Sequence, residues 1–195
     1  MGKKQHSKDK LYILPSEYCL DWGGYKFNNK PVEYTKFDEC ALTLMPIKDA
    51  VCTKEGIVYE KDNIERYIDI YGQNPFNGEQ LSKSDVIQLH YDLNSEGKFC
   101  CPITKKTFGN SSHIVVNSKS GYVYSYNTVD ELNRKARNWN DLVTGEKFSS
   151  KDLIVIQDPL HFQSRELKNF HYIKEGRRLT AQFGDLKVPQ QEHEF

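Results

Sequence analysis

The chain has 195 residues, and its 27 lysines and arginines are balanced by 27 aspartates and glutamates. A formal net charge of zero argues against a protein held to nucleic acid or to an anionic membrane mainly by bulk charge. Hydrophobic residues make up 37% of the chain and aromatic residues 12%, which predicts one or two modest folded cores. No apolar run approaches the ~20 residues of a membrane-spanning helix, and the first residues lack the apolar stretch of a signal peptide.

Residues 1–36 are expected to form an extended basic and aromatic arm. Four lysines stand against one acidic residue in the first ten positions, and tyrosines and tryptophan follow. Such an arm is suited to docking on a large partner, and direct contact with nucleic acid is expected here if anywhere. A frayed, solvated terminus is the alternative.

From residue 37 a pattern begins that returns from residue 99, and this points to an internal repeat. A Cys-x-Leu/Ile-Thr motif, a Gly-x-Val-Tyr motif and a Gly-Glu dipeptide each occur twice, in the same order. The spacing between the copies grows along the chain, as loop insertions would make it. We therefore predict two divergent modules over residues 37–96 and 97–159. The matched positions are Cys40 and Cys101, Gly56 and Gly121, and Gly78 and Gly145.

The first copy predicts a loop, a β-hairpin, a helix and a second loop. Residues 50–52 and 57–59 are the expected strands, because apolar residues flank a turn that contains Gly56. A helix follows, with Gly72 as its stop. Its apolar positions recur with helical spacing at Ile64, Tyr67, Ile68 and Tyr71.

The second copy predicts the same order of elements, so the expected class is α+β. Strands are expected at 114–116 and 122–124. The helix should begin at a cap on Asn127 or Thr128. Its apolar stripe should consist of Val129, Leu132 and Ala136. Residues 160–195 show no clear period and are expected to be a linker-like tail.

Modules of this size are often held together by zinc, which requires four Cys or His ligands, typically in Cys-x2-Cys pairs. Neither copy contains such a pair, so we expect no metal and no other cofactor. Five cysteines are an odd number without a secretion signal, which predicts reduced thiols. The first copy offers Cys40, Cys52 and His90; the second offers the adjacent Cys100 and Cys101 and a lone His113.

At these residues the chain resembles a known family. Residues 37–89 resemble a U-box, the zinc-free, RING-like domain of ubiquitin ligases, and residues 99–156 resemble a more divergent one. Together with the opening residues and the motifs at 74–79, 94–98 and 153–159, they are similar to the amino-terminal half of the U-box cyclophilins. The resemblance implies a nuclear, spliceosome-associated protein. The family's cyclophilin domain lies downstream of this region, so no peptidyl-prolyl isomerase activity is expected of this chain.

The resemblance also implies the residues of a docking surface. A U-box ligase makes no covalent intermediate, so no catalytic residue is expected; it holds a ubiquitin-charged conjugating enzyme near a substrate lysine. In the first copy the expected contacts are Leu42 and Leu44 in the first loop and Pro75 in the second. The alternative is that the two leucines are ordinary core residues, which would lie on the same side of an extended loop.

In the second copy the possible contacts are Ile103 and Leu142, and the proline has been replaced. Active U-boxes often carry an Arg or Lys shortly after the second-loop proline, which hydrogen-bonds ubiquitin and the conjugating enzyme. Gly78 and Gly145 occupy that position here and offer no donor side chain. We therefore expect the first copy, if either, to engage a conjugating enzyme, and the second to serve as a packing or protein-binding module.

Two functions are consistent with these expectations. The first is a ubiquitin-protein ligase, with a conjugating enzyme, ubiquitin and spliceosomal proteins as partners. The second is a non-catalytic U-box scaffold that helps to assemble the splicing machinery. The two glycines favour the scaffold, and the pairing of Leu42 with Pro75 favours the ligase.

Overall fold

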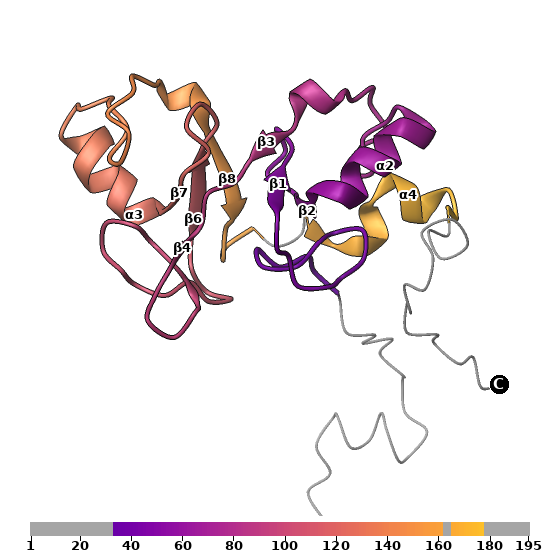
Figure 1. Cartoon of the computed structure of the whole chain (residues 1–195), viewed down its shortest axis with the longest axis horizontal. Coiled ribbons are helices and arrows are strands. Elements are labelled where there is room, and N and C mark those ends of the chain that lie inside the picture. The colour runs from indigo at the N-terminus through magenta and orange to yellow at the C-terminus, as the bar shows by residue number, and fades with distance from the viewer. Residues whose placement is uncertain (1–32, 162–164, 178–195) are drawn as a thin grey trace, which may run out of the picture. The chain divides into compact units, whose positions relative to one another are not determined.

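The computed structural model describes residues 33–161 and 165–177 of the chain (Figure 1). All the described residues belong to one compact unit that begins at Glu33. Most of the predicted arm and the end of the predicted tail lie outside the described residues. The described part is a mixed α/β structure with small sheets and short helices. No helix in these ranges is long and apolar enough to cross a membrane.

The first module is built on a three-stranded antiparallel sheet. Its strands are β1 (Ala50–Cys52), β2 (Val58–Glu60) and β3 (Ile87–Gln88), in the order β2-β1-β3. β1 and β2 form the predicted hairpin. The turn between them contains Gly56, whose φ of 76° explains the choice of glycine.

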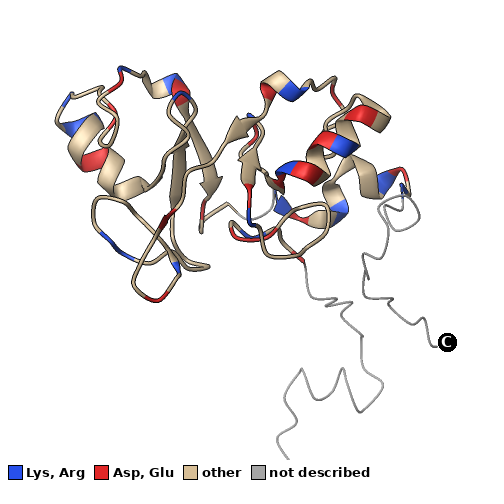
Figure 2. Ribbon diagram, in the orientation of Figure 1, with Lys and Arg blue, Asp and Glu red and all other residues tan. Residues whose placement is uncertain are grey.

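The helix α2 (Lys61–Tyr71) follows the hairpin, as predicted. Ile64, Tyr67 and Ile68 are buried along one face. Gly72 ends the helix in the left-handed conformation, and its N–H donates to the carbonyl of Ile68 at 2.8 Å. Acidic and basic residues alternate along the ribbon of the helix in Figure 2.

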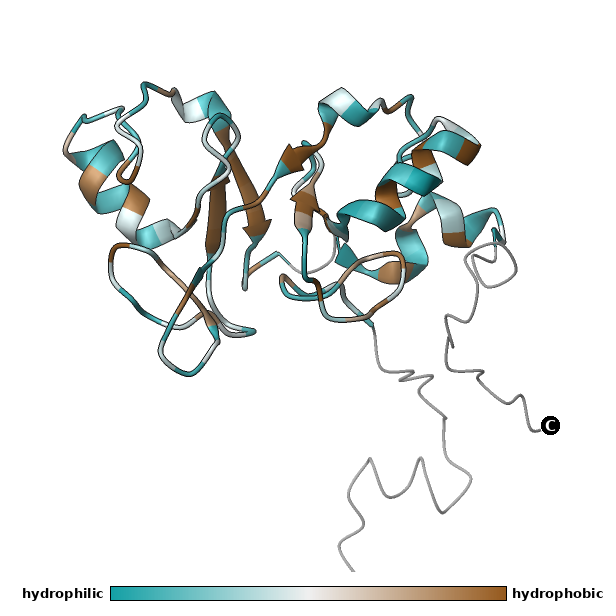
Figure 3. Cartoon of the chain, in the orientation of Figure 1, coloured by the Kyte–Doolittle hydropathy of each residue, from teal (hydrophilic) through white to brown (hydrophobic). Residues whose placement is uncertain are grey.

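The second module repeats this sheet. Its strands are β6 (Ile114–Asn117), β7 (Val123–Ser125) and β8 (Leu153–Gln157), in the order β7-β6-β8. The short hairpin of β4 (Asp92–Leu93) and β5 (Phe99–Cys100) lies at the junction between the two repeats. The strands of both sheets are mostly hydrophobic (Figure 3).

The second helix differs from its prediction. α3 (Tyr126–Val129) continues as a π-helix (Asp130–Lys135), and the chain enters it at Ser125 without a side-chain cap. The predicted cap at Asn127 or Thr128 is therefore wrong, because both residues lie inside the first turn.

The predicted apolar stripe of this helix is also wrong beyond Val129. Leu132 is 43% exposed and Ala136 is exposed, whereas Asn133 is only 1% exposed. A π-helix closes its hydrogen bonds over five residues instead of four, and its wider turn rotates Leu132 further from the face of Val129 while Asn133, four positions after Val129, stays on that face. Asn133 is satisfied in this position, since its Nδ2 donates to the carbonyls of Asn138 at 2.7 Å and Asn140 at 2.8 Å.

The backbone conformations of the two predicted copies agree at single turns. The matched glycines have φ values of 76° and 73° at the hairpin turns and of 77° and 73° in the second loops. In the first loops Leu44 and Lys105 have φ values of 56° and 55°, although neither is a glycine. In each module a Ser-x-x-Asp capping box opens a short 3-10 helix at Lys83–Asp85 or Ser150–Asp152, directly before the third strand.

The two modules contact each other reciprocally through their hairpin turns. A Cβ atom on Gly56 would lie 2.0 Å from the carbonyl oxygen of Val155 in β8, and a Cβ on Gly121 would lie 2.2 Å from that of Gln88 in β3. Each turn therefore packs on the third strand of the other module. The buried Arg165 completes one of these contacts, because its guanidinium donates to the carbonyls of Gly56 and Val155 at 3.2 Å.

Residues 165–177 are not the linker that the sequence predicts. They form a 3-10 turn (Leu167–Asn169) and the helix α4 (His171–Lys174), which lies beside α2 in Figure 1. Leu167, Phe170 and Tyr172 are buried in the main core. The sequence lacks a period here because the buried residues anchor turns instead of one long helical face.

Candidate docking surfaces

The first loop of the first module is a closed turn. The N–H of Leu44 donates to the carbonyl of Cys40 at 2.7 Å, and the N–H of Cys40 donates to the carbonyl of Met45 at 2.8 Å. Because the chain turns here, Leu42 and Leu44 do not share one side of an extended strand. Leu42 is 5% exposed and belongs to the core, whereas Leu44 is half-buried at its margin.

The second loop of the first module is organised by Asn74. Its N–H donates to the carbonyl of Glu79 at 2.7 Å and its side-chain oxygen accepts from the N–H of Phe76 at 3.0 Å. Its amide group donates to the Glu55 carboxylate at 3.0 Å, which ties the loop to the β1–β2 turn. Pro75 stands on this loop and is buried.

Helix α4 brings the two loops together. The N–H groups of His171 and Tyr172 donate to the carbonyls of Phe76 at 2.9 Å and Pro75 at 3.1 Å. The Tyr172 hydroxyl reaches the first loop and donates to the carbonyl of Ala41 at 3.0 Å. We call the surface formed by residues 40–46 and 74–78 the first docking surface. Residues 170–177 cover part of it, whereas Met45 remains 54% exposed.

Arg177 holds the far end of this cover. Its guanidinium donates to the Tyr67 hydroxyl at 3.2 Å and to the Gln73 side-chain oxygen at 3.1 Å. It also lies 4.5 Å from the centre of the Tyr71 ring, within the range of a cation–π contact. Burial raises the pKa of the Tyr172 phenol, so this side chain stays a neutral donor.

The equivalent surface of the second module has the same backbone and is open. The N–H of Lys105 donates to the carbonyl of Cys101 at 2.8 Å, and that of Gly145 donates to the carbonyl of Asp141 at 2.9 Å. Ile103 is 39% exposed and Leu142 is half-buried. We call the surface formed by residues 101–107 and 141–146 the second docking surface.

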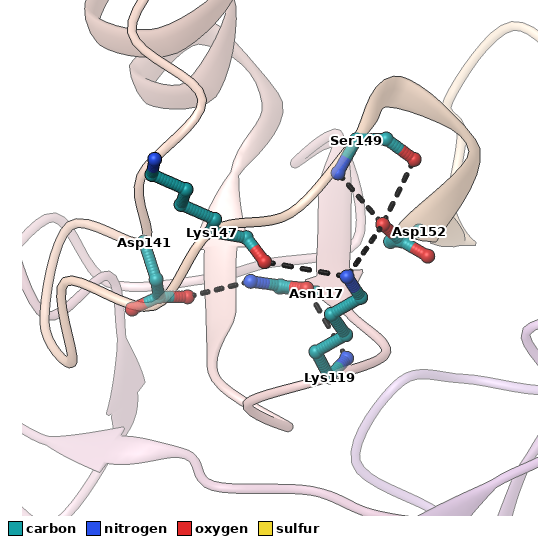
Figure 4. Close-up of polar contacts among 6 residues, drawn as sticks. All are labelled: Asn117, Lys119, Asp141, Lys147, Ser149 and Asp152. Carbon is teal, nitrogen blue, oxygen red and sulfur yellow. Dashed lines mark hydrogen bonds and ion pairs between the residues drawn. The ribbon is translucent and has the colours of Figure 1, made fainter.

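Asp141 organises the second loop in the place that Asn74 holds in the first module. Figure 4 shows its carboxylate against the side-chain amide of Asn117, which donates at 2.7 Å. Burial alone would raise the pKa of Asp141, but hydrogen bonds from Ser120, Thr144, Tyr124 and Val143 outweigh it and lower the pKa to about 2. The loop is therefore held by a charged acceptor.

The same close-up shows how the neighbouring loop is anchored. The Lys119 ammonium donates to the carbonyl of Lys147 at 3.3 Å and lies 3.6 Å from the Asp152 carboxylate. Asp152 accepts from the N–H of Ser149 at 2.6 Å and from its hydroxyl at 2.8 Å. These bonds lower the pKa of Asp152. They connect the β6–β7 turn and the chain after the second loop to the start of β8.

The structure explains why glycine occupies both predicted donor positions, Gly78 and Gly145. Both adopt a positive φ that side chains other than glycine rarely accept. A Cβ on Gly78 would also lie 2.6 Å from the His171 ring, whereas one on Gly145 would meet nothing within 4 Å. The first glycine is thus required by the cover as well as by the turn.

The cysteines are buried thiols in the described residues. Cys40, Cys52, Cys100 and Cys101 are free, and burial raises the pKa of Cys52 to about 12. Within the same ranges no group of three or more His, Cys, Asp or Glu side chains could hold a metal ion. His113 stacks on the Tyr126 ring with centroids 4.1 Å apart.

The sequence reasoning missed the residues of the cover, Phe170, His171, Tyr172 and Arg177. The only signal was the aromatic run at 170–172, which carries the family resemblance but has no periodic pattern. Its burial depends on two loops that lie about 100 positions earlier in the chain, as the hydrogen bond between Arg177 and Gln73 illustrates.

The fold and these surfaces define a mixed α/β protein with two copies of one small module, each presenting two loops closed by backbone hydrogen bonds. The chain is similar to curated proteins named peptidyl-prolyl cis-trans isomerases. It is 40% identical over 181 residues to CYP65 of Arabidopsis thaliana, covering 92% of this chain and 30% of that protein. It is 37% identical over 179 residues to isomerase 4 of Caenorhabditis elegans, covering 89% and 34%.

Several further homologues carry the name peptidyl-prolyl cis-trans isomerase-like 2. That of Aspergillus oryzae is 39% identical over 160 residues, which cover 82% of this chain and 28% of that protein. These names agree with the cyclophilin-type family that the sequence motifs predict. The chain spans about a third of the length of the relatives it matches. No protein-family model matches it.

Proposed function

We propose that this chain is a ubiquitin-ligase-type protein with two U-box modules. One module would dock a ubiquitin-charged conjugating enzyme on its pair of loops, and the other would bind a further protein; the sequence favours the first module for the enzyme, whereas the more exposed loops belong to the second. Catalysis would consist of proximity and orientation, with no covalent intermediate on this chain. The nuclear location and the association with splicing proteins belong to the same proposal.

The observation that carries the proposal is the duplicated pair of loops. In both modules the loops are fixed by backbone hydrogen bonds and by one Asn or Asp side chain, in the role that zinc plays in RING domains. The second docking surface presents Ile103 and Val143, which are 39% and 45% exposed. An exposed aliphatic pair on rigid loops is suited to binding a partner protein.

A second function, that of a non-catalytic scaffold, is favoured by a different observation. Leu42 is a buried core residue, and Pro75 is buried on a loop to which residues 170–177 hydrogen-bond, so part of the surface expected to bind the conjugating enzyme is covered in this structure. Gly78 and Gly145 also provide no donor toward ubiquitin. The isomerase activity in the relatives' names belongs to those proteins, and its absence from this chain stays a prediction.

An in vitro ubiquitination assay with a panel of conjugating enzymes tests the proposal. The variant Ile103→Ala removes an exposed side chain on the second docking surface. Leu44→Lys alters the first docking surface with a residue that the second module already accommodates, since Lys105 has nearly the same φ. Leu160→Ala is the control, because Leu160 is an aliphatic residue 83% exposed and outside both loop pairs.

Ubiquitin chains that depend on Ile103 or Leu44, but not on Leu160, would support the ligase and identify the module that works. Thermal unfolding of each variant should remain within a few degrees of the wild type, because surface substitutions have small effects on stability. A folded chain that promotes no transfer with any enzyme of the panel would refute the ligase and favour the scaffold.

A further inference from the structure

The exposure of equivalent residues differs between the two docking surfaces. Leu42 is 5% exposed, whereas its counterpart Ile103 is 39% exposed. Pro75 is buried, whereas its counterpart Leu142 is half-buried. Because both modules share the same turns and hydrogen bonds, the backbone of the loops does not cause this difference. Residues 170–177 hydrogen-bond to both loops of the first module, and the described part of the second module has no corresponding segment.

The contact between the cover and the first docking surface has the character of a bound peptide. Two backbone N–H groups of α4 donate to the second loop, and the Tyr172 hydroxyl donates to the carbonyl of Ala41 in the first. The Phe170 ring packs edge-to-face on Phe76, with centroids 5.1 Å apart and an interplanar angle of 82°. Tyr172 thus connects both loops, through its hydroxyl and its backbone N–H, and the Phe170 ring anchors the start of the helix.

The charged end of the cover is also matched to this module. Arg177 has two uncharged acceptors and an aromatic face on the first module, at Tyr67, Gln73 and Tyr71. Glu175 lies 2.5 Å from the Arg177 guanidinium and 3.0 Å from the His171 ring, so it links both ends of the segment. Specific contacts at three points distinguish this segment from a chain that merely passes over the surface.

We propose that the first docking surface is a binding site for a short aromatic helical segment, which residues 170–177 fill in cis, so that this segment and a conjugating enzyme exclude one another. The competition rests on the proposed function, whereas the peptide site does not. A cover of one short helix can open locally while both modules stay folded. The apparent affinity of the surface for any other ligand is then reduced by the fraction of molecules that are open.

The variant Tyr172→Asp is designed to open the cover, because a buried carboxylate would face the carbonyl of Ala41 without a donor. Ile173→Asp is the matched control: it makes the same change of charge one residue later, where the side chain is 40% exposed. Hydrogen exchange at the N–H groups of His171 and Tyr172 measures the opening directly. Exchange at these sites should accelerate in Tyr172→Asp and remain slow in Ile173→Asp.

The probe is a labelled synthetic peptide with the sequence of residues 165–177, added in trans. We expect the opened variant Tyr172→Asp to bind it on the order of tenfold more tightly than the wild type or Ile173→Asp, since only the opened surface is free. A peptide that itself carries Tyr172→Asp should bind none of the three proteins (wild type, Tyr172→Asp and Ile173→Asp). Opening detected by exchange without any gain in peptide binding would overturn the inference.

The same three proteins are then tested with the panel of conjugating enzymes. Tighter binding to Tyr172→Asp, reversed by the peptide, would support the competition. Equal binding of an enzyme to the opened and the closed chain would overturn it. If the peptide arm succeeds and no enzyme binds any variant, the result refutes the proposed ligase function and leaves the peptide site supported.

Discussion

Replacing Asp141 by asparagine should destabilise the second module, because its carboxylate is the common acceptor of the second loop. The side chain is 4% exposed and accepts five hydrogen bonds. The donors are the side chains of Asn117 at 2.7 Å, Ser120 at 2.6 Å and Tyr124 at 2.7 Å and the N–H groups of Val143 and Thr144, both at 2.9 Å.

The size of the effect can be worked out from the pKa of Asp141. It lies at about 2 in the folded protein against an ordinary value of 3.8. This gap corresponds to about 2.5 kcal/mol of stability, present above pH ~4 and lost as the pH falls toward 2. In Asp141→Asn the side-chain NH₂ group replaces a carboxylate oxygen and faces two hydrogen-bond donors. The free energy of unfolding should therefore fall by about 2 kcal/mol at pH 7.

The first module suggests a second substitution that should restore the stability of Asp141→Asn. There Asn74 occupies the equivalent position and donates to Glu55, while the residue equivalent to Glu55 in the second module is Ser120. Adding Ser120→Glu to Asp141→Asn transplants the arrangement of the first module. The double variant should regain at least half of the lost stability, whereas Ser120→Glu alone should be destabilising because two carboxylates would meet.

Urea unfolding at pH 7 measures all four proteins as a double-mutant cycle. Acid titration of the wild type and Asp141→Asn provides a second measurement, since the variant should lose the part of the acid sensitivity that Asp141 causes. A loss below about 0.5 kcal/mol in Asp141→Asn would contradict the account, because it lies within the range of ordinary surface substitutions. A double variant less stable than Asp141→Asn would show that the two loops are not interchangeable.

Three further substitutions test contacts that stabilise the fold outside the two docking surfaces. Gly121→Ala should lower the thermal midpoint by several degrees, because its Cβ would meet the carbonyl of Gln88 at 2.2 Å and its φ is 73°; differential scanning calorimetry measures this. Gln157→Glu should cost about 2–3 kcal/mol in urea unfolding, since the Gln157 amide donates to the carbonyls at positions 109, 110 and 112, which would repel a carboxylate. Burial lowers the pKa of His113, so the neutral ring is favoured on folding and stability falls as the pH drops below about 6.5. His113→Phe should reduce the fall in thermal midpoint between pH 7 and pH 5.5, and an unchanged fall would contradict this assignment.

The sequence predicted those elements that local chemistry determines. The hairpin turns require φ > 0 and therefore glycine, so Gly56 and Gly121 marked them in both modules. The helix at 61–71 could be predicted because Ile64, Tyr67 and Ile68 recur on one face and Gly72 ends it. The repeat could be found for the same reason, since turn residues survive divergence when the backbone conformation does.

The second helix could not be predicted in the same way. A π-helix has no distinct pattern of apolar residues, and the residue that it buries here is polar. Asn133 is accepted in the core because two carbonyls of the following loop satisfy its amide, and that loop is positioned only in the folded chain. Leu132 is 43% exposed, because the wider turn of the π-helix rotates it away from the face of Val129.

The candidate site shows the same division between local and distant causes. The sequence found the loops of both docking surfaces, because their turns are local, but it could not determine which surface is accessible. Accessibility depends on Tyr172, which reaches a loop 131 positions earlier through a single hydrogen bond. In the first module the aliphatic residues of the loops are core residues beneath a cover; in the second, Ile103 stands at the surface in the same backbone turn. One module topology can therefore serve both as a closed site and as an open one, and the segment after the second module decides which.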